Sequence, residues 1–457
     1  MCVLRGVGSI RKENMKLKFI DLFAGLGGFH IALKKLGHEC VYASEIRESL
    51  KDLYKENYGI EPEGDIKKAN IYKIPRHDIL CGGFPCQPFS KAGKKLGRKD
   101  NTIGNLFDDI IKIMAYHKPE FFILENVPFI ASQDNESMWT HMQDEFKRIK
   151  YHTSHMNYSP HEFGIPQNRE RIYIVGCRSG LDHFEWVEPK NEKTDIRMIL
   201  DKHPEDSKKI GKGELKALGL WQEFISQIPK DVQIPRFPIW GMEFGATYPY
   251  EGKYPAIMTS EELGQYRGNF GVKLEGMTKE EQLRNLPSYA RVDKPFPHWK
   301  KRYIRENRSF YLTNKKHLWR VVRKIGRLRS QSWQKLEWNV GDDERVIENY
   351  IIQFRASGIR LKKTETSPSL VCTSTQIPMI PWEKRYLTKT EGARLQSMEG
   401  IKLPENHTSC FRALGNAVNV EIILQIANKL ITTEVSGIVE LKPVRNKQNN
   451  IKKIRFK

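Results

Sequence analysis

One cysteine of the sequence stands in a setting that suits nucleophilic chemistry. Cys86 lies in the run Gly83-Phe84-Pro85-Cys86-Gln87-Pro88-Phe89-Ser90, directly after a short apolar stretch. Prolines and glycines fix an irregular loop there, and α/β enzymes place reactive groups on loops at the carboxyl ends of strands. A free thiol has a pKa of about 8.5, so the thiol needs activation before it attacks. Most cysteines are small buried hydrophobes, but the flanking prolines disfavour burial, and we predict that Cys86 is a nucleophile.

Charged and polar residues end two further apolar runs. Glu125 closes one run and would lie beside the Cys86 loop if the two strands are neighbours. Gln167, Arg169 and Arg171 precede the last strand of the block, and alternation places all three on one face of an extended chain. Two guanidinium groups on one face suit a phosphate or a base edge. The alternatives are an ordinary surface carboxylate and a surface ladder of salt bridges with the intervening glutamate.

A glycine-rich turn precedes these residues. Asp21-Leu22-Phe23-Ala24-Gly25-Leu26-Gly27-Gly28 stands where a first strand turns into a first helix, and its glycines let the backbone approach a ligand. A dinucleotide fingerprint is incomplete because His30 replaces its third glycine. A plain tight turn is the other alternative. Glu45, after the second strand, could accept both ribose hydroxyls, and Asp65, expected at the end of a third strand, could meet an adenine amino group. The two acids favour an adenosine-containing cofactor.

Size and composition indicate a globular protein. The chain has 457 residues, of which 39% are hydrophobic and 29% charged. No apolar run approaches the roughly 18 to 20 residues of a membrane helix, and the N-terminus has no apolar stretch of signal-peptide length. We therefore expect a cytoplasmic protein without membrane association. The seven cysteines show no paired spacing, so reduced thiols are expected and neither a structural disulfide nor a metal site.

The charge balance favours a polyanionic partner. Lys and Arg number 76 against 55 Asp and Glu, for a net charge of +21. A generally lysine-rich proteome is the alternative, but the charge is uneven: the segment Lys300–Arg329 holds twelve Lys or Arg and one acid, Glu306. Aromatic residues, among them Tyr311 and Trp319, are interleaved with these cations. We interpret the segment as phosphate contacts with aromatic support rather than as a solvated helix face.

The first 180 residues alternate short apolar runs with helical patterns, which is typical of a parallel α/β sheet. Strands are expected at Lys18–Phe23, Cys40–Ser44, Asp78–Cys81, Phe121–Leu124 and Arg171–Gly176. Helices are expected at Gly28–Leu36, Glu48–Tyr58, Asn105–Ala115 and Ser137–Lys150. After about Leu181 the βα repeat fades, and helical patterns return only at Thr388–Gln396 and Ala417–Leu430. The late helices belong either to the first domain, interrupted by an insertion, or to a second domain.

The ordered set of motifs resembles the DNA cytosine-5 methyltransferase family, of the kind found in bacterial type II restriction–modification systems. The resemblance covers about 180 N-terminal residues and about 50 late ones. Its matching blocks are Phe23-Ala24-Gly25-Leu26-Gly27, Glu45, Asp65-Ile66, Pro85-Cys86-Gln87, Glu125-Asn126-Val127, Gln167-x-Arg169-x-Arg171, Arg385-Tyr386-Leu387-Thr388 through Glu391, Arg394 and Gln396, and Gly415-Asn416-Ala417-Val418.

The resemblance implies a fold and a division into domains. The fold is α/β, a Rossmann-like S-adenosylmethionine-dependent methyltransferase fold with a mixed, mostly parallel sheet, an antiparallel final strand and an inserted target-recognition domain. The late helix after Asn416 would return to pack beside the cofactor turn. The implied division is a catalytic domain at 16–180 and 382–435, a target-recognition domain at 181–381 and a basic tail at 436–457.

The resemblance also implies the chemistry, in which the Cys86 thiolate attacks C6 of a flipped cytosine so that C5 can take a methyl group from S-adenosylmethionine. Duplex DNA is the implied substrate, a cognate restriction endonuclease acts separately on the same sequence, and the protein is expected to be a monomer. The implied catalytic residues are Cys86, Glu125, Arg169 and Arg171. The implied cofactor contacts are Phe23, Gly25, Leu26, Gly27, Glu45, Ile46, Asp65, Ile66, Pro85, Asn416, Ala417 and Val418. The implied DNA contacts are Gln87, Ser90, Gln167, Arg302, Arg305, Arg308, Ser369 and Leu370.

Two segments of the insertion have more than one interpretation. Thr366–Val371 resembles a small threonine-leucine element that precedes the late motif in the family, with serine where threonine is usual. Phe237–Phe244 is an apolar cluster, interpreted first as core of the insertion and second as a base-contacting loop. Three other functions compete with DNA methylation: methylation of transfer RNA, a non-catalytic DNA-binding relative, and an NAD-dependent oxidoreductase. The long basic insertion argues against the first, and the presence of Cys86 and Glu125 against the second. The incomplete glycine fingerprint argues against the third.

Overall fold

The N-terminal sheet has the mixed topology that the sequence predicts. The computed structural model describes residues 16–85, 104–182, 184–190, 192–202, 204–370 and 376–437. Six strands lie in the order β2-β1-β3-β4-β7-β5, and β7 alone runs antiparallel to its neighbours β4 and β5. The bounds are β1 Lys18–Leu22, β2 Glu39–Ser44, β3 Ile79–Gly83, β4 Phe121–Asn126, β5 His152–Tyr158 and β7 Arg171–Cys177. The antiparallel final strand is confirmed, and β5 is an edge strand that the sequence analysis missed.

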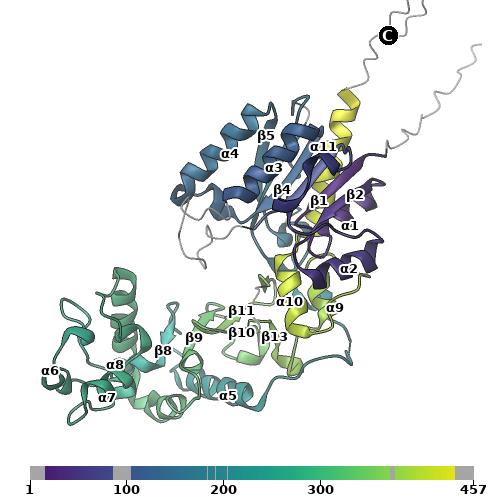
Figure 1. Ribbon diagram of the computed structural model, residues 1–457. Helices are drawn as coiled ribbons and strands as arrows, with labels where there is room; N and C mark the ends of the chain where they lie inside the picture. The colour runs from purple at the N-terminus through teal and green to yellow at the C-terminus, as the bar shows by residue number, and fades with distance from the viewer. Residues whose placement is uncertain are drawn as a thin grey trace, which may run out of the picture.

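Alternate residues of the strands serve two different helical layers. Phe19 and Ile123 belong to a core shared with α1 and α11, whereas Ile20 and Leu124 belong to a core shared with α3 and α4. Figure 1 shows α11, at the C-terminal end of the fold, lying beside the sheet with α1. The helices are α1 Gly28–Lys35, α2 Glu48–Tyr58, α3 Gly104–His117, α4 Glu136–Arg148 and α11 Val420–Gly437. Both faces of the sheet are therefore covered, and its carboxyl edge stays open.

A second, smaller lobe follows the sheet in the sequence. Its six strands lie in the order β14-β13-β10-β11-β9-β8, and all neighbours are antiparallel except β9 and β11. The strands are β8 Ile239–Trp240, β9 Lys335–Asn339, β10 Ile351–Arg355, β11 Gly358–Lys362, β13 Met379–Ile380 and β14 Arg385–Tyr386. The helices are α5 Lys212–Gln227, α6 Ser260–Gly264, α7 Lys279–Arg284 and α8 His298–Ile325. The cluster Phe237–Phe244 is core, because Ile239, Met242 and Phe244 are buried.

The basic segment Lys300–Arg329 is mostly one long helix, and the structure corrects the expected role of one of its aromatic residues. Along α8 the residues Ile304, Tyr311 and Leu318 are buried against the lobe, while most cations face outward. Seven-residue spacing of these apolar positions is that of a helix with one buried stripe. Tyr311 is consequently a core residue rather than support for a phosphate, whereas Trp319 stays 41% exposed.

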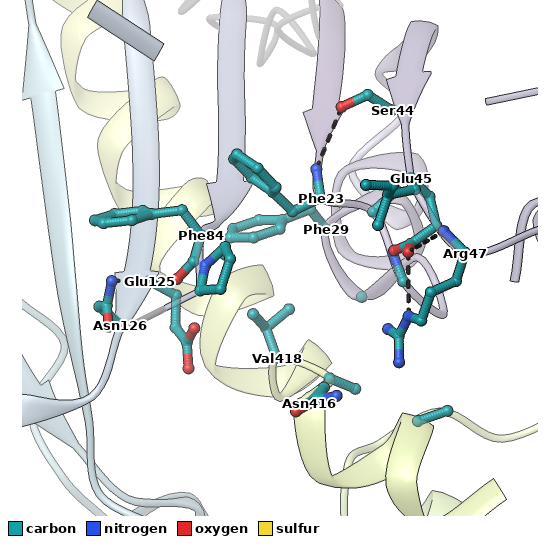
Figure 2. A pocket seen from close by; sticks show the side chains of 18 of the residues that line it. Phe23, Phe29, Ser44, Glu45, Arg47, Phe84, Glu125, Asn126, Asn416 and Val418 are labelled. Atoms are coloured by element: carbon teal, nitrogen blue, oxygen red, sulfur yellow. Dashed lines mark hydrogen bonds and ion pairs between the residues drawn. The ribbon is translucent and has the colours of Figure 1, made fainter. Parts of the chain in front are cut away.

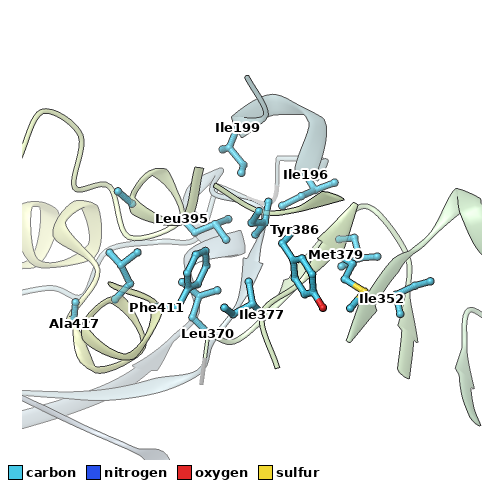
Figure 3. Close-up of a cluster of buried hydrophobic side chains, with 14 of the residues drawn as sticks. Ile196, Ile199, Ile352, Leu370, Ile377, Met379, Tyr386, Leu395, Phe411 and Ala417 are labelled. Atoms are coloured by element: carbon cyan, nitrogen blue, oxygen red, sulfur yellow. The ribbon is translucent and has the colours of Figure 1, made fainter. Parts of the chain in front are cut away.

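The returning chain joins the two lobes through a shared core. In Figure 3, Ile352 of the second sheet, Tyr386 of β14, Leu395 directly after α9 and Phe411 of α10 belong to one buried cluster. The late helices are α9 Lys389–Arg394, α10 His407–Asn416 and α11. Helix α10 was not predicted, and α11 begins at Val420 rather than Ala417 because Ala417 is the C-cap of α10. Within the described stretches of the chain, no helix has the length and apolarity to cross a membrane.

Candidate active site

A cavity of about 520 Å³ opens at the carboxyl edge of the N-terminal sheet. Figure 2 shows Phe23, Glu45, Glu125, Asn416 and Val418 around it; they come from the residues directly after β1 and β2, from β4, from the end of α10 and from the turn before α11. Of the residues predicted from the sequence, the cavity is lined by Phe23, Gly25, Glu45, Ile46, Asp65, Ile66, Pro85, Glu125, Arg169, Arg171, Asn416, Ala417 and Val418. Leu26 and Gly27 belong to the same loop but do not line it. The cavity therefore unites the two predicted groups, catalytic and cofactor-binding.

The glycine loop has a backbone that few residue types tolerate. Phe23, Gly25 and Gly27 all have positive φ, of 57°, 55° and 79°. A Cβ on Gly27 would also lie 2.4 Å from the ring of Tyr58. Phe23 is an L-residue in the left-handed region, a strained arrangement that surrounding contacts must stabilise. One such contact is the Phe23 N–H, which donates to Ser44 Oγ at 3.4 Å.

Glu45 links this loop to the end of β2. Its Oε2 accepts the Gly25 N–H at 3.0 Å, and its Oε1 accepts the Arg47 N–H at 2.9 Å and Arg47 Nε at 3.2 Å. The carboxylate is nearly buried yet lines the cavity. Because a carboxylate can accept about four hydrogen bonds, Glu45 keeps capacity for ligand hydroxyl donors. The residue fits a ribose.

Asp65 lines the same cavity from a different kind of element than predicted. It follows no strand; its Oδ1 accepts the Lys67 N–H at 3.0 Å and caps the short 3₁₀ helix Ile66–Lys68. The segment between α2 and β3 consists of such turns, joined to β2 by an isolated bridge between Ser44 and Glu63. The prediction that Asp65 ends a third strand is therefore wrong. Its position at the cavity does not depend on that strand.

Glu125 meets Arg171 in the cavity wall. Arg171 Nε lies 3.0 Å from Glu125 Oε1, and the carboxyl is only 7% exposed. Burial raises the pKa of Glu125 above its usual value, and the nearby Arg171 and Arg169 guanidiniums partly oppose that shift. Gly83, the last residue of β3, lies beside it: a Cβ there would be 3.4 Å from Glu125 Oε2. The chain continues from Gly83 through Pro85 to Cys86, which lies outside the described residues.

Arg169 ties together three distant segments. Its backbone N–H donates to Ser159 Oγ at 2.9 Å, its Nη2 donates to the Ala417 carbonyl at 3.1 Å, and its Nη1 donates to Ser369 Oγ at 3.4 Å. Gln167 does not line the cavity: it is fully buried, and its Oε1 accepts Gln396 Nε2 at 3.3 Å. Its predicted contact with DNA is therefore corrected. Of the three alternating residues, the two arginines face the cavity.

A buried polar network beneath the glycine loop was missed by the sequence analysis. Tyr54 of α2 donates to Asp21 Oδ2 at 3.3 Å and its hydroxyl lies 2.8 Å from His30 Nδ1. Tyr58, one turn later, donates to the Leu26 carbonyl at 2.7 Å and stacks on His30 with centroids 4.2 Å apart. Burial raises the pKa of Asp21 well above its ordinary value and lowers that of His30 to about 4. The i, i+4 spacing of two tyrosines on α2 was the available signal.

Some of the predicted DNA contacts are exposed in the structure and others are buried. Gln87 and Ser90 lie outside the described residues, and Arg302 and Arg305 are exposed on α8, where Arg305 pairs with Glu251 at 2.5 Å. Arg308 needs correction: its Nε binds the buried Glu243 at 2.9 Å and its Nη1 donates to a backbone carbonyl, so it is committed to the lobe's interior. Leu370 is also corrected, because it is buried in the core that joins the lobes. The predictions for Arg308 and Leu370 were wrong because their burial depends on packing against segments far away in the sequence.

The sheet, with one antiparallel strand, a cavity at its carboxyl edge and a glycine loop after β1, has the architecture of S-adenosylmethionine-dependent methyltransferases. The sequence profile of the C-5 cytosine-specific DNA methylase family matches residues 17–232 and 251–432. The chain belongs to that family.

Individual relatives agree with the family assignment. The type II methyltransferase M.HhaI of Haemophilus parahaemolyticus is 41% identical over 191 residues, covering 41% of this chain and 58% of the relative. M.HaeII of Haemophilus aegyptius is 39% identical over 223 residues, covering 49% of this chain and 68% of the relative. In most of the type II methyltransferases that match, the matched segment spans roughly half to two thirds of the relative's length. A solved structure of a DNA modification methyltransferase encoded within an E. coli prophage has a TM-score of 0.52 at 16% identity. It covers 92% of this chain and 100% of that one, and supports the fold.

Proposed function

We propose that this protein transfers a methyl group from S-adenosylmethionine to C5 of a flipped cytosine in a specific duplex DNA sequence. The observation that carries the proposal is one cavity with two chemistries: Glu45 faces it at one end, and Glu125 with Arg169 and Arg171 at the other. Glu45 would bind the adenosine of the cofactor and Glu125 would bind the cytosine, so one cavity could hold both ligands for methyl transfer. In a restriction–modification setting the reaction protects host DNA from a separately acting endonuclease.

The cofactor-binding half of the cavity fits S-adenosylmethionine on its own geometry. Glu45 would accept the ribose hydroxyls, while Phe23 and Ile66 would contact the adenine, with Asp65 at its amino group. Gly28 keeps the turn before α11 close, since a Cβ there would lie 2.5 Å from Val418 Cγ2. When bound, the cofactor supplies an electrophilic methyl group. The residues of this chain hold and orient it.

The other half of the cavity would act on the cytosine. The Cys86 thiolate would attack C6, forming an S–C6 bond and moving the electrons of the C5–C6 double bond toward C5 and N3. Glu125 would hydrogen-bond or protonate N3 as charge accumulates there, which its raised pKa favours. Arg169 would hold the base carbonyl or the adjacent phosphate. After methylation, loss of the C5 proton and breaking of the S–C6 bond restore the aromatic ring and free Cys86.

We place the DNA between the two lobes, beside the cavity. The target cytosine is stacked inside the duplex and must flip out of it to enter the cavity. We assign residues 16–180 and 382–435 to the catalytic domain, 181–381 to target recognition and 436–457 to a basic tail. The exposed cations of α8 support DNA as the polyanionic partner. A cytoplasmic monomer is the form that we propose.

Methylation of DNA in cells expressing the protein tests the proposal. Bisulfite sequencing should find 5-methylcytosine at one short recurring sequence, and no methylation with wild type would contradict the proposal. Cys86→Ser should abolish methyl transfer but leave binding of DNA and cofactor within about twofold, since the hydroxyl is a poorer nucleophile than a thiolate. Retained turnover by Cys86→Ser would mean that another residue is the nucleophile.

Transfer RNA is the second candidate substrate. Labelled methyl groups from S-adenosylmethionine should appear in duplex DNA and not in transfer RNA when both are offered. Labelling of RNA alone would replace the proposal. The DNA candidate is favoured by the second lobe with its basic helix, because recognition of one sequence in a duplex needs an extended surface beyond the catalytic cavity.

A further inference from the structure

Two lysines of the second lobe share one aromatic ring. Lys300 Nζ lies 5.2 Å and Lys335 Nζ 5.5 Å from the ring centroid of Tyr289. Lys300 also lies 5.2 Å from the ring of Trp299, and Lys335 lies 5.8 Å from that of Trp240. The five residues come from the start of α8, the start of β9, the end of β8 and the turn before α8. Segments far apart in the sequence thus assemble two cations on one aromatic surface.

Glu243, the carboxylate whose charge raises the pKa of Lys335, already has partners of its own. Glu243 accepts the hydroxyls of Tyr248 and Tyr289, the latter at 2.6 Å, and its other oxygen pairs with Arg308 Nε at 2.9 Å. In the part of the chain that the structure describes, no ion pair joins Lys300 or Lys335 to a carboxylate. The cluster therefore carries an excess of two positive charges.

Neither ammonium is freely solvated. Both side chains are partly buried, and burial lowers the pKa of each; Lys300 lowers that of Lys335 further. Cation–π contacts stabilise an ammonium, but two like charges on one ring repel each other. Trp299 beside them is 51% exposed, an unusual place for a large apolar side chain. Cations without a carboxylate partner suit the phosphates of a DNA backbone, and the exposed indole offers an apolar face beside them.

We propose that Lys300 and Lys335, with Trp299 against the sugar, form a binding site for backbone phosphates of the DNA duplex. The inference rests on the proposed function and adds to it a phosphate anchor outside the catalytic cavity. A backbone phosphate beside each ammonium group offsets their mutual repulsion. Phosphate contacts position a protein on DNA without reading its sequence, so the site contributes affinity and register rather than choice of target.

The competing explanation is that the two lysines only stabilise the fold, through their cation–π contacts with the aromatic rings. Lys279 provides a comparison within the same lobe, because it is also partly buried with a pKa lowered by burial. Its ammonium donates to the carbonyls of Pro255, at 2.7 Å, and Met258, so its hydrogen bonds are satisfied internally. Substituting Lys279 therefore reproduces the loss of a half-buried lysine without touching the proposed site.

The salt dependence of DNA binding separates the two explanations. Affinity of the full-length protein for a 30-base-pair duplex is measured by fluorescence anisotropy across a series of NaCl concentrations. Each phosphate contact contributes about 0.9 to the slope of log K against log salt. We expect the double variant Lys300→Gln/Lys335→Gln to lower the slope by about 2, with weaker binding at low salt. Lys279→Gln and the exposed Lys216→Gln should keep the wild-type slope.

The melting temperatures of the same proteins show whether a substitution has impaired folding. If the double variant unfolds earlier but its slope equals that of wild type, the lysines only brace the rings and the inference is wrong. A slope lowered equally by Lys216→Gln would also overturn it, because general charge and not the site would then be responsible. Failure of the proposed function is recognised separately, as absence of DNA methylation by wild-type protein.

Discussion

Arg171 and Glu125 form an ion pair of 3.0 Å across two antiparallel strands, at the wall of the cavity. The pair combines two opposing influences on one carboxyl. Burial favours the protonated form of Glu125, and the guanidinium favours the ionised form. Because burial dominates, the pKa is raised above its usual value, which favours the carboxyl as a donor of a proton or a hydrogen bond to a base.

Glu125→Gln should therefore lower the rate of methyl transfer without lowering the stability of the fold. Gln resembles the protonated acid, so methyl transfer should fall by about 100-fold or more with the loss of proton donation. A raised folded-state pKa means that stability is full at low pH and is lost as pH rises through that pKa. The variant lacks this loss, so its melting temperature should equal or exceed that of wild type at pH 8, with the difference vanishing toward pH 4.

Glu170→Gln is the matched control for this change. Glu170 is a nearby exposed carboxylate outside the cavity wall, and its loss should leave turnover and melting temperature unchanged. A Glu125→Gln protein that melts lower than wild type at pH 8 would show that the ion pair with Arg171 outweighs the cost of burial.

Arg171→Gln should move the pH profile of methylation upward. The Arg171 charge lowers the pKa of Glu125, so its removal raises that pKa further. If protonated Glu125 assists the reaction, the decline of activity at high pH should shift to higher pH, while the maximal rate falls about tenfold or more through lost positioning. Arg171→Lys keeps the charge and should keep the wild-type profile. Single-turnover rates between pH 6 and 10 measure both effects, and a downward shift for Arg171→Gln would contradict the assignment.

Much of the site could be predicted because its residues are tied to strand ends. Glu45 follows β2 and Glu125 lies at the end of β4, and parallel strands bring their carboxyl ends to one edge. The alternation of Arg169 and Arg171 likewise follows from extended backbone. These inferences need only the period of a strand and the direction of its chain.

What could not be predicted depends on packing between distant segments. The pattern around Arg308 looks like any basic helix, and only the fold shows that Glu243 and Tyr248 receive its guanidinium. Leu370 lies in an otherwise polar stretch yet is buried against the late helices. Asp65 was assigned to a strand because acids at strand ends recur in such folds, whereas the segment is a series of 3₁₀ turns.

Gly28→Ala should weaken cofactor binding through a steric conflict. The new Cβ would lie 2.5 Å from Val418 Cγ2 and 3.0 Å from the Val418 carbonyl. Overpacking of this kind costs about 1 to 3 kcal/mol, and displacing the turn before α11 widens the cavity. We expect S-adenosylmethionine affinity, measured by isothermal titration calorimetry, to fall about tenfold.

The double variant Gly28→Ala/Val418→Ala checks that cause. Removing Val418 Cγ2 relieves the shortest contact but leaves those with Met398 Cε, at 2.9 Å, and with the Val418 carbonyl, so affinity should recover in part. An affinity no better than that of Gly28→Ala would show that the conflict with the Val418 side chain is not what weakens binding.

Tyr58→Phe should affect binding of the cofactor more than the chemical step. The Tyr58 hydroxyl donates to the Leu26 carbonyl at 2.7 Å, while its ring stacks on His30 and would survive the substitution. A buried hydrogen bond contributes about 1 kcal/mol, and here it holds a loop strained at Phe23. We expect the Kd and KM for S-adenosylmethionine to rise about fivefold, with kcat at saturating cofactor unchanged. Tyr42→Phe, which removes a hydroxyl bonded to Glu63 away from the loop, should leave both constants unchanged. If kcat falls while KM stays constant, Tyr58 does not act through the cofactor loop.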